Sequence, residues 1–446
     1  MAKHVREPAR DVPVVGEYDV VVLGGGPAGV AGAVSAARAG ASVLLVEQTG
    51  CLGGMSTNGL VPCFAPLGLG GRLAIKGIAL EVVRRLRRAG GVGTAGPRTD
   101  TLAWIPTDPE KLKLVYDEMT AEAGVEVLYF TLASGVIRRG KRITHVIIEN
   151  KSGRQAAAAR VFIDATGDAD VAAMAGAEFD KGDKRGRMQS ASLCYFIGGV
   201  DFPKYHRFVA TIRDRMAWFL KLEKAGRLPR LPRTEYRGLG TGRLTQWLGG
   251  VNFAHMFDVD GCNAQDLSRV MRDGRRMAHA YVEYARRHLP GMRDARIVAT
   301  AALAGIRESR RIRGRTTLTL EDYLGRRHTS EDIARCDYPI DVHNTSRAGY
   351  RKFVKDYESL LMRPGESYGI PFGCLLPKGL DNLAVAGRSL SADRPMQGSA
   401  RVMPACFAMG QAAGLAAAMA ARRRIPLHKV DVAALRGKLS KAGVRL

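Results

Sequence analysis

The stretch from Tyr18 to Gln48 constrains the fold of this chain more than any other part of the sequence. Asp19–Leu23 is a short apolar, β-branched run, long enough for a buried strand, and a glycine-rich turn follows it at once. A helix rich in alanine is expected next, and the following apolar run ends in Glu47. Strand, glycine turn, helix, strand and acid in this order are typical of a βαβ unit that binds a dinucleotide.

The glycine turn has the spacing that a pyrophosphate requires. Gly24 allows the tight turn, Gly26 lets the phosphates approach the backbone, and Gly29 lets the helix press against the strand. Pro27 and Ala28 suit the first helical turn, where the N–H that proline lacks would have no partner. The oriented N–H groups and the positive end of the helix then favour an anion at this position.

Glu47 lies 23 residues after Gly24, close to the usual spacing for a carboxylate that binds ribose hydroxyls. A carboxylate there would repel a 2′-phosphate, so the sequence favours FAD or NAD over NADP. Because no second glycine fingerprint stands between a strand and a helix, we expect a single dinucleotide domain.

Further elements can be placed along the chain. Arg160–Ala165 is expected to be a strand that runs into a Thr-Gly turn, and Asn263–Leu289 a long helix with one apolar face. The most apolar long stretch, Val402–Ala421, contains Pro404 and Gln411 and is mostly alanine. It therefore indicates a buried helix rather than a membrane span.

Composition limits the classes of function. A length of 446 residues suggests two or three domains, and 68 Lys and Arg against 43 Asp and Glu give a net charge of +25. Such a charge fits anionic substrates, nucleic acid or a membrane surface. The arginines are spread along the whole chain, which argues against a dedicated nucleic-acid surface.

The cysteines and the N-terminal residues indicate in which cellular compartment the protein is expected. The seven cysteines are odd in number and form no C-x-x-C pair, which argues against a disulfide framework or a metal site and fits a reducing cytoplasm. Met1–Gly16 is polar, so no signal peptide is expected. We therefore expect a cytoplasmic protein without a membrane anchor.

Taken together, these motifs make the chain similar to a known family. It resembles the FAD-dependent oxidoreductases related to the fumarate reductase and succinate dehydrogenase flavoproteins, over almost its whole length. The matching stretches are Tyr18–Gln48, Cys51–Met55, Phe162–Asp170, Gly305–Gly314, Leu376–Arg388 and Gly398–Met403.

This resemblance implies an α/β fold: a Rossmann-like FAD-binding domain of the glutathione-reductase type with an inserted α+β cap. Residues 17–190 and 365–446 would form the discontinuous FAD-binding domain, and 191–364 the substrate or cap domain, to which 60–105 could contribute. Covalent relatives attach the flavin through a histidine. Since none lies in Gly50–Gly59, we expect non-covalent FAD.

The resemblance also assigns residues to the cofactor. The C-terminal helix, expected to begin near Pro404, would direct its positive end at the flavin ring. For Arg388 and Arg401, the alternative to a contact with FAD is surface ion pairing. The expected FAD-binding residues are Gly24, Gly26, Pro27, Ala28, Gly29, Glu47, Gln48, Gly53, Gly54, Met55, Val127, Ala165, Thr166, Gly167, Gly387, Arg388, Arg401 and Val402.

Catalysis needs a group that moves the substrate proton and a group that holds the substrate. His255 and His343 are candidates for the proton, and Arg307 and Arg310 for gripping a carboxylate. The alternatives are core histidines, or arginines paired with Glu308 or Asp341.

We expect hydride transfer between FAD and a small polar, anionic organic substrate. A flavoprotein that modifies RNA and a flavin-dependent hydroxylase remain the other interpretations. The electron partner and a homo-oligomeric state stay open.

Overall fold

β1 (Val14–Leu23) stands at the centre of the larger lobe of the molecule, and its last four residues are fully buried. It lies parallel to β2 (Val43–Val46) on one side and to β10 (Gly153–Asp164) on the other. The seven-stranded sheet runs in the order β7-β2-β1-β10-β9-β8, with β20 also paired to β10. Its remaining strands are β7 (Glu126–Leu128), β8 (Leu132–Arg139), β9 (Arg142–Asn150) and β20 (Leu383–Val385).

The ends of the parallel strands meet at one edge of this sheet. Leu23 is in register with Val46 and with Asp164, and Asp164 with Val385. The residues that follow these four strands therefore come together at one edge, which is where ligands bind in open α/β sheets.

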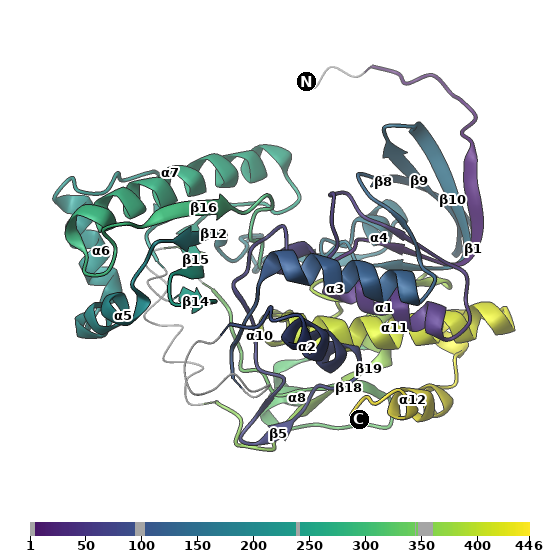
Figure 1. Ribbon diagram of the computed structural model, residues 1–446. Helices are drawn as coiled ribbons and strands as arrows, with labels where there is room; N and C mark the ends of the chain where they lie inside the picture. Colours follow the sequence, from purple (N-terminus) through teal and green to yellow (C-terminus); the bar gives the residue numbers. More distant parts are fainter. Residues whose placement is uncertain (1–4, 94–102, 238–240, 344, 347–359) are drawn as a thin grey trace.

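The first and the last long helices of the chain pack against each other beside the sheet (Figure 1). α1 (Pro27–Arg38) and α11 (Met403–Arg423) approach so closely that a Cβ on Gly410 would lie 2.0 Å from the carbonyl oxygen of Ala28. Only glycine at position 410 fits this contact. The packing brings the beginning of α11 to the glycine turn of β1–α1.

α11 is long and apolar enough to cross a membrane by length and composition, and no other helix among the described residues is. Within the structure, 94% of its apolar window is buried. A core helix passes the same test, so this is weak evidence for a membrane span.

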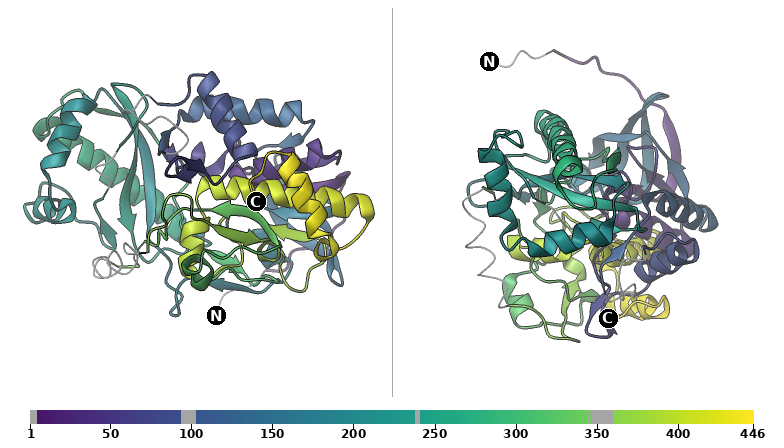
Figure 2. Two further views of the ribbon diagram at one scale, coloured as in Figure 1. Left: turned by 90° about the horizontal axis from the view of Figure 1, so that it is seen from below. Right: turned by 60° about the vertical axis from the view of Figure 1, so that its left-hand side comes forward.

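β12 (Ala191–Gly198) is the central strand of the smaller lobe, which Figures 1 and 2 show beside the larger one. It lies antiparallel to β15 (Leu248–Met256) and β16 (Arg296–Thr300), in the order β13-β15-β12-β16. α7 (Ala264–His288) contacts this sheet through its buried face. The other elements are β13 (Thr234–Glu235), β14 (Thr241–Arg243), α5 (Phe202–Thr211) and α6 (Arg215–Lys224).

The packing differs from the expected domain limits in one region. α8 (Leu320–Leu324), β18 (Asp332–Cys336) and Ile340 contribute to the core of the larger lobe, although the sequence placed 191–364 in the cap. Most buried apolar residues within 60–105 also belong to this core, whereas Leu60 joins the core of the smaller lobe. The smaller lobe thus has its own core between about 191 and 301.

The structure is a computed structural model that describes residues 5–93, 103–237, 241–343, 345–346 and 360–446. Residues 347–359 of the expected cap lie outside the described residues. The remaining elements are α2 (Ile78–Arg88), α3 (Pro109–Glu122), α4 (Asp170–Met174), α10 (Arg394–Ala400), α12 (Val432–Lys441), β3 (Cys63–Phe64), β4 (Gly68–Leu69), β5 (Arg72–Leu73), β6 (Ile105–Pro106), β11 (Phe179–Lys181), β17 (Arg310–Ile312) and β19 (Tyr368–Pro371).

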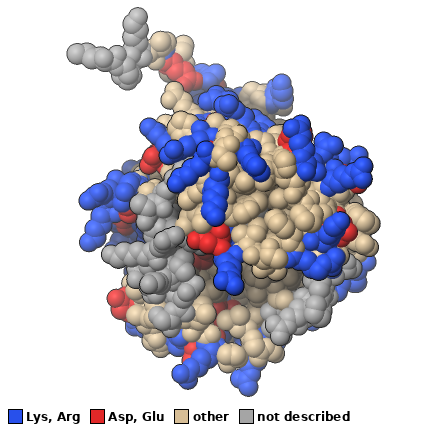
Figure 3. Space-filling view, turned by 90° about the vertical axis from the view of Figure 1, so that its left-hand side faces the viewer, with Lys and Arg blue, Asp and Glu red and all other residues tan. Residues whose placement is uncertain are grey.

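The basic side chains on one face of the molecule are scattered rather than clustered. Figure 3 shows the face on the side of the smaller lobe, where Lys and Arg side chains are scattered and separated by areas of other residues. On this face they do not gather into a single stripe.

Candidate active site

The glycine turn between β1 and α1 has the conformation that the spacing predicts. Gly24 has φ +97°, a left-handed conformation that favours glycine. A Cβ on Gly29 would lie 1.7 Å from the carbonyl oxygen of Gly24, so helix and strand touch there. A Cβ on Gly26 would meet nothing within 4 Å. The second glycine of the fingerprint therefore faces open space, as an approaching ligand requires.

Glu47 holds this turn in place from the end of β2. Its carboxylate accepts hydrogen bonds from the Gly25 N–H at 2.7 Å and from the Thr49 N–H at 2.8 Å. The Gly53 N–H in turn donates to the Gly25 carbonyl at 2.7 Å. Glu47 is buried and lines the cavity described next, where its remaining lone pairs can accept from ribose hydroxyls.

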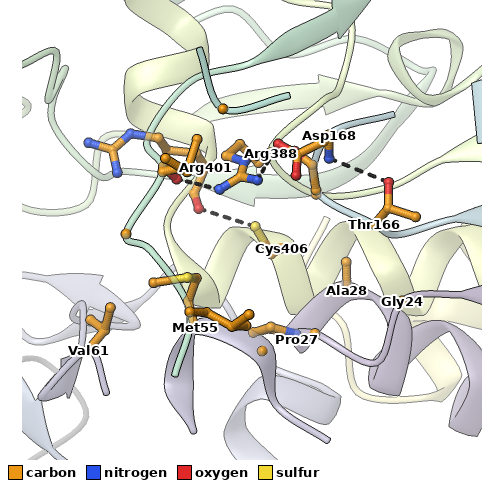
Figure 4. A pocket seen from close by; sticks show the side chains of 18 of the residues that line it. Gly24, Pro27, Ala28, Met55, Val61, Thr166, Asp168, Arg388, Arg401 and Cys406 are labelled. Atoms are coloured by element: carbon orange, nitrogen blue, oxygen red, sulfur yellow. Dashed lines mark hydrogen bonds and ion pairs between the residues drawn. The ribbon is translucent and has the colours of Figure 1, made fainter. Parts of the chain in front are cut away.

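A cavity of about 770 Å³ runs from this turn to the start of α11 and under the sheet of the smaller lobe. Its size lies at the upper end of the usual range for ligand pockets, which suits an extended dinucleotide. Figure 4 shows Pro27 and Met55 on one side of it, with Arg388, Arg401 and Cys406 opposite.

The turn after β10 forms a second part of the wall. The buried Asp164 carboxylate accepts from the Thr166 N–H at 3.1 Å, from the Thr166 hydroxyl at 2.7 Å and from the Ala172 N–H at 2.9 Å. Burial raises the pKa of Asp164 to about 6. Asp164 thus shapes the Thr166–Gly167 turn without lining the cavity.

Arg388 lines the cavity, but protein groups engage its guanidinium. It donates to the Gly167 carbonyl at 2.7 Å, to the Asp168 carboxylate at 2.7 Å and to the Ile306 carbonyl. These bonds tie the turn after β10 to the chain that leaves β16, so the geometry gives Arg388 a positioning role. Its expected contact with FAD remains a prediction.

The beginning of α11 reaches the cavity as well. The helix begins at Met403, one residue before the expected start, and its N-cap, Val402, provides no side-chain cap. The backbone N–H groups of the first turn of a helix lack intrahelical acceptors and carry partial positive charge. Val402, Met403 and Cys406 line the cavity, so this end of the helix faces it.

Arg307 is the most isolated charge of the site. Its side chain is buried, lines the cavity and donates to the Ser190 carbonyl at 2.8 Å. Asn252 lies at a marginal 3.5 Å, and no described carboxylate is within ion-pair distance. Burial and the neighbouring Arg401 lower the pKa of Arg307 to about 10, so it is still charged at neutral pH.

Asp341 and His343 complete a polar cluster with Arg401. Arg401 donates to the Asp341 carboxylate at 3.0 Å and to its carbonyl at 2.9 Å. His343 Nε2 lies 3.2 Å from Asp341 Oδ1, and His343 Nδ1 lies 3.1 Å from His255 Nε2. Arg307, Arg401, Asp341 and His343 all line the cavity, whereas His255 lies behind His343.

The charges of this cluster follow from its surroundings. Burial opposes the charge of Asp341, but Arg401, His343 and Arg307 outweigh it and hold the pKa of Asp341 well below its usual range. Burial and the cation Arg307 lower the pKa of His343 to about 4, and burial also lowers the pKa of His255 well below its usual value. At pH 7 the cluster thus has two cations, one anion and two neutral imidazoles.

The structure brings most of the expected site residues to the cavity. Those that do not line it have other surroundings: Gly29 and Gly53 pack against backbone and side chains, and Val127 pairs with β2. Arg310 is paired with Asp170 at 2.8 Å. The lining residues are Gly24, Gly26, Pro27, Ala28, Glu47, Gln48, Gly54, Met55, Ala165, Thr166, Gly167, Gly387, Arg388, Arg401, Val402, Arg307 and His343.

The sequence did not indicate several other residues that line the cavity. Asp341 was named only as an alternative ion-pair partner, although the spacing Asp-x-His was a usable signal. Nothing in the sequence marks Ser192 and Cys194 on β12 or Asn252 on β15, because only sheet pairing brings them together. Trp104 and Tyr338, with ring centroids 6.1 Å apart, lie on the wall as well.

The fold and the cavity define a dinucleotide-binding protein of the α/β class, in which one cofactor would lie between the sheet edge and α11. Residues 19–439 match the family model described as FAD dependent oxidoreductase. The chain belongs to this family, it is an oxidoreductase and its cofactor is FAD. The open space at Gly26 and the continuous cavity fit that cofactor.

Two curated relatives match part of the chain. Digeranylgeranylglycerophospholipid reductase 2 of Methanothermobacter thermautotrophicus is 30% identical over 201 residues, which is 42% of this chain and 48% of that protein. Dihydrolipoyl dehydrogenase of Trypanosoma brucei brucei is 46% identical over 59 residues, 13% of this chain and 12% of the relative. The matches thus span half the length of these relatives or less.

Among solved structures, a geranylgeranyl bacteriochlorophyll reductase-like protein of Thermoplasma acidophilum has a TM-score of 0.48 and 13% identity. That comparison covers 96% of this chain and 84% of the other. An anhydrotetracycline hydroxylase of Streptomyces rimosus has a TM-score of 0.46 and 11% identity, covering 95% and 65%. Identities this low carry no argument about the substrate.

Proposed function

We propose that this protein is a dehydrogenase or reductase that transfers a hydride between FAD and a small polar, anionic organic substrate. When bound, FAD supplies the hydride acceptor or donor. The residues of the chain bind the substrate and orient it. The expected kinship with the fumarate reductase and succinate dehydrogenase flavoproteins and the non-covalent attachment of FAD belong to this proposal.

The observation that carries the proposal is Arg307. A buried cation without a carboxylate partner is costly, and a planar guanidinium binds carboxylates through two parallel hydrogen bonds. Arg307 is such a cation among the described residues, and it faces the cavity that fits the cofactor. An anionic group of the substrate would give the Arg307 guanidinium the negatively charged partner that it does not have among the described residues.

Arg401 and Asp341 extend the site beyond that anion. The Arg401 Nε is buried without a hydrogen-bond partner in the described part of the chain, and the Asp341 carboxylate is 36% exposed. Asp341 can accept a hydrogen bond from a substrate hydroxyl, while the arginines neutralise a carboxylate. A substrate with an oxygen function near an acidic group therefore matches the cluster.

The test is anaerobic reduction of the FAD-loaded protein by a panel of hydroxy acids, sugars, phosphorylated sugars and saturated acids, followed by its visible absorbance. The chemically reduced protein is then tested with enoates, oxo acids and a geranylgeranyl-bearing glycerophospholipid, the class that the archaeal relative is named for. We expect at least one anionic member to change the flavin spectrum. A response only to neutral members would overturn the anionic class.

The same preparation addresses the two other interpretations. Product-linked oxygen uptake in the presence of a reductant would indicate a hydroxylase. Salt-sensitive binding of tRNA would indicate RNA modification. We expect neither.

A further inference from the structure

Three side chains form a hydrogen-bonded row that leads from the cavity into the smaller lobe. Asp341 and His343 line the cavity, and the His343 side chain is 23% exposed, toward that space. His255, on β15, lies behind them and is 4% exposed. The two links are 3.2 Å, from Asp341 Oδ1 to His343 Nε2, and 3.1 Å, from His343 Nδ1 to His255 Nε2.

The geometry leaves one arrangement of protons when both imidazoles are neutral. An ionised carboxylate only accepts hydrogen bonds, so His343 Nε2 must carry the proton that points at Asp341. A neutral imidazole has one N–H, so His343 Nδ1 is an acceptor and His255 Nε2 must donate to it. The last atom, His255 Nδ1, is buried and has no hydrogen-bond partner in the described part of the chain.

The cations around the row oppose a second proton on either ring. Arg307 and Arg401 do so at His343, and Arg307 and Arg237 at His255, whereas the Asp341 carboxylate favours a second proton on His343. Glu235 lies opposite His255 in the register of β13 and β15. Burial adds to the cations, and the pKa of His343 falls to about 4.

We infer that His255 is a positioning residue, which donates its Nε2 proton to His343 and thereby fixes His343 as an Nε2–H donor aimed at Asp341. The row then keeps the face that the substrate meets in one charge state between pH 5 and pH 8. Both ring nitrogens of His343 are engaged, so this residue orients Asp341 rather than removing a substrate proton. The inference rests on the proposed function, because it concerns the substrate side of the same cavity.

The first experiment compares His255→Phe with His255→Gln in the FAD-loaded protein. Phenylalanine removes the donor, whereas the amide of glutamine can place an N–H near the position of Nε2. The pKa of His343 should rise in His255→Phe, because the bond that favours its neutral form is lost.

For the substrate that the panel identifies, kcat/KM of His255→Phe should change about threefold or more between pH 8 and pH 5, relative to the parent. The His255→Gln profile should stay close to the parent. A His255→Phe profile that runs parallel to the parent would overturn the inference.

The second experiment needs neither a substrate nor a variant of His255. Long-range ¹H–¹⁵N NMR of histidine-labelled protein shows which ring nitrogen carries the proton, and His343→Gln identifies the signals of His343 by their loss. We expect an unprotonated Nδ1 at His343 that does not titrate between pH 8 and pH 5. A protonated Nδ1 would overturn the inference and leave the proposed function standing. If NMR gives the expected result but no anion reduces or oxidises the flavin, the inference stands and the proposed function is overturned.

Discussion

The two walls of the cavity differ in composition. The wall that faces the expected cofactor is mostly backbone: Gly24, Gly26 and the turn at Thr166–Gly167 come from the ends of neighbouring strands. The opposite wall consists of side chains, Arg307, Asp341, His343 and Arg401 among them, which come from segments far apart in the sequence. The first wall tolerates little change in shape, and the second little change in charge.

Gly29→Ala should have the largest effect, because it acts on the packing of the backbone wall. The added Cβ would lie 1.7 Å from the Gly24 carbonyl oxygen, which cannot move without displacing the strand. We expect a loss of about 3 kcal/mol of stability or more, measured by chemical or thermal unfolding. Gly437→Ala in α12 is the control, since its Cβ would meet nothing within 4 Å. Equal stability of the two variants would contradict this account of the first wall.

Arg307→Met should have the next largest effect, on the charged wall. Losing hydrogen bonds to a charged group costs about 2–3 kcal/mol, which corresponds to roughly a 30- to 150-fold lower kcat/KM for the anionic substrate. The fold should persist, because an uncompensated buried cation is removed. Arg313→Met, which removes an exposed arginine paired with Asp180, serves as the control. If both variants reduce their flavin at the rate of the parent, Arg307 does not bind the substrate.

Gly26→Ala separates the two functions of the glycine turn. The residue has φ −68° and open space around it, so alanine fits the unliganded protein. The methyl group would enter the space where the backbone meets the cofactor. We expect unchanged unfolding of the apoprotein and a roughly tenfold weaker binding of FAD, by titration calorimetry. Unaltered FAD affinity would show that the cofactor does not approach Gly26.

The smallest expected effect per residue is the pH dependence of stability that the two histidines cause. Their pKa values are lowered by folding, so the unfolded chain binds protons that the folded chain does not. The part of the stability that depends on the two histidines is therefore present above their ordinary pKa of about 6.5 and is lost as the pH falls below it. Between pH 6.5 and pH 5.5 each histidine should cost about 1 kcal/mol. The double variant His255→Gln/His343→Gln should lose that part of the slope, and an identical slope in denaturant unfolding would refute the assignment.

The sequence determined the β1–α1–β2 part of the backbone wall because its signals are local. Glycine spacing, the small residues of α1 and the acid at the end of β2 lie within about thirty residues, and local geometry decides what they form. Only the second half of β10 was predicted. Arg160–Ala165 was expected, but the strand begins at Gly153, because β1 and β9 pair with the alanine run at 156–159. Alanine has low strand propensity, and tertiary pairing overrides it there.

The tertiary structure alone decided the charged wall. Arg307, Asp341 and His343 could be singled out by residue type, but their distances depend on how the smaller lobe packs on the larger one. The same packing left Arg310 outside the cavity, paired with Asp170, although it stands three residues from Arg307 in the sequence. Backbone conformation is set by neighbours along the chain, whereas the partner of a charge is set by what the fold brings within a few ångströms.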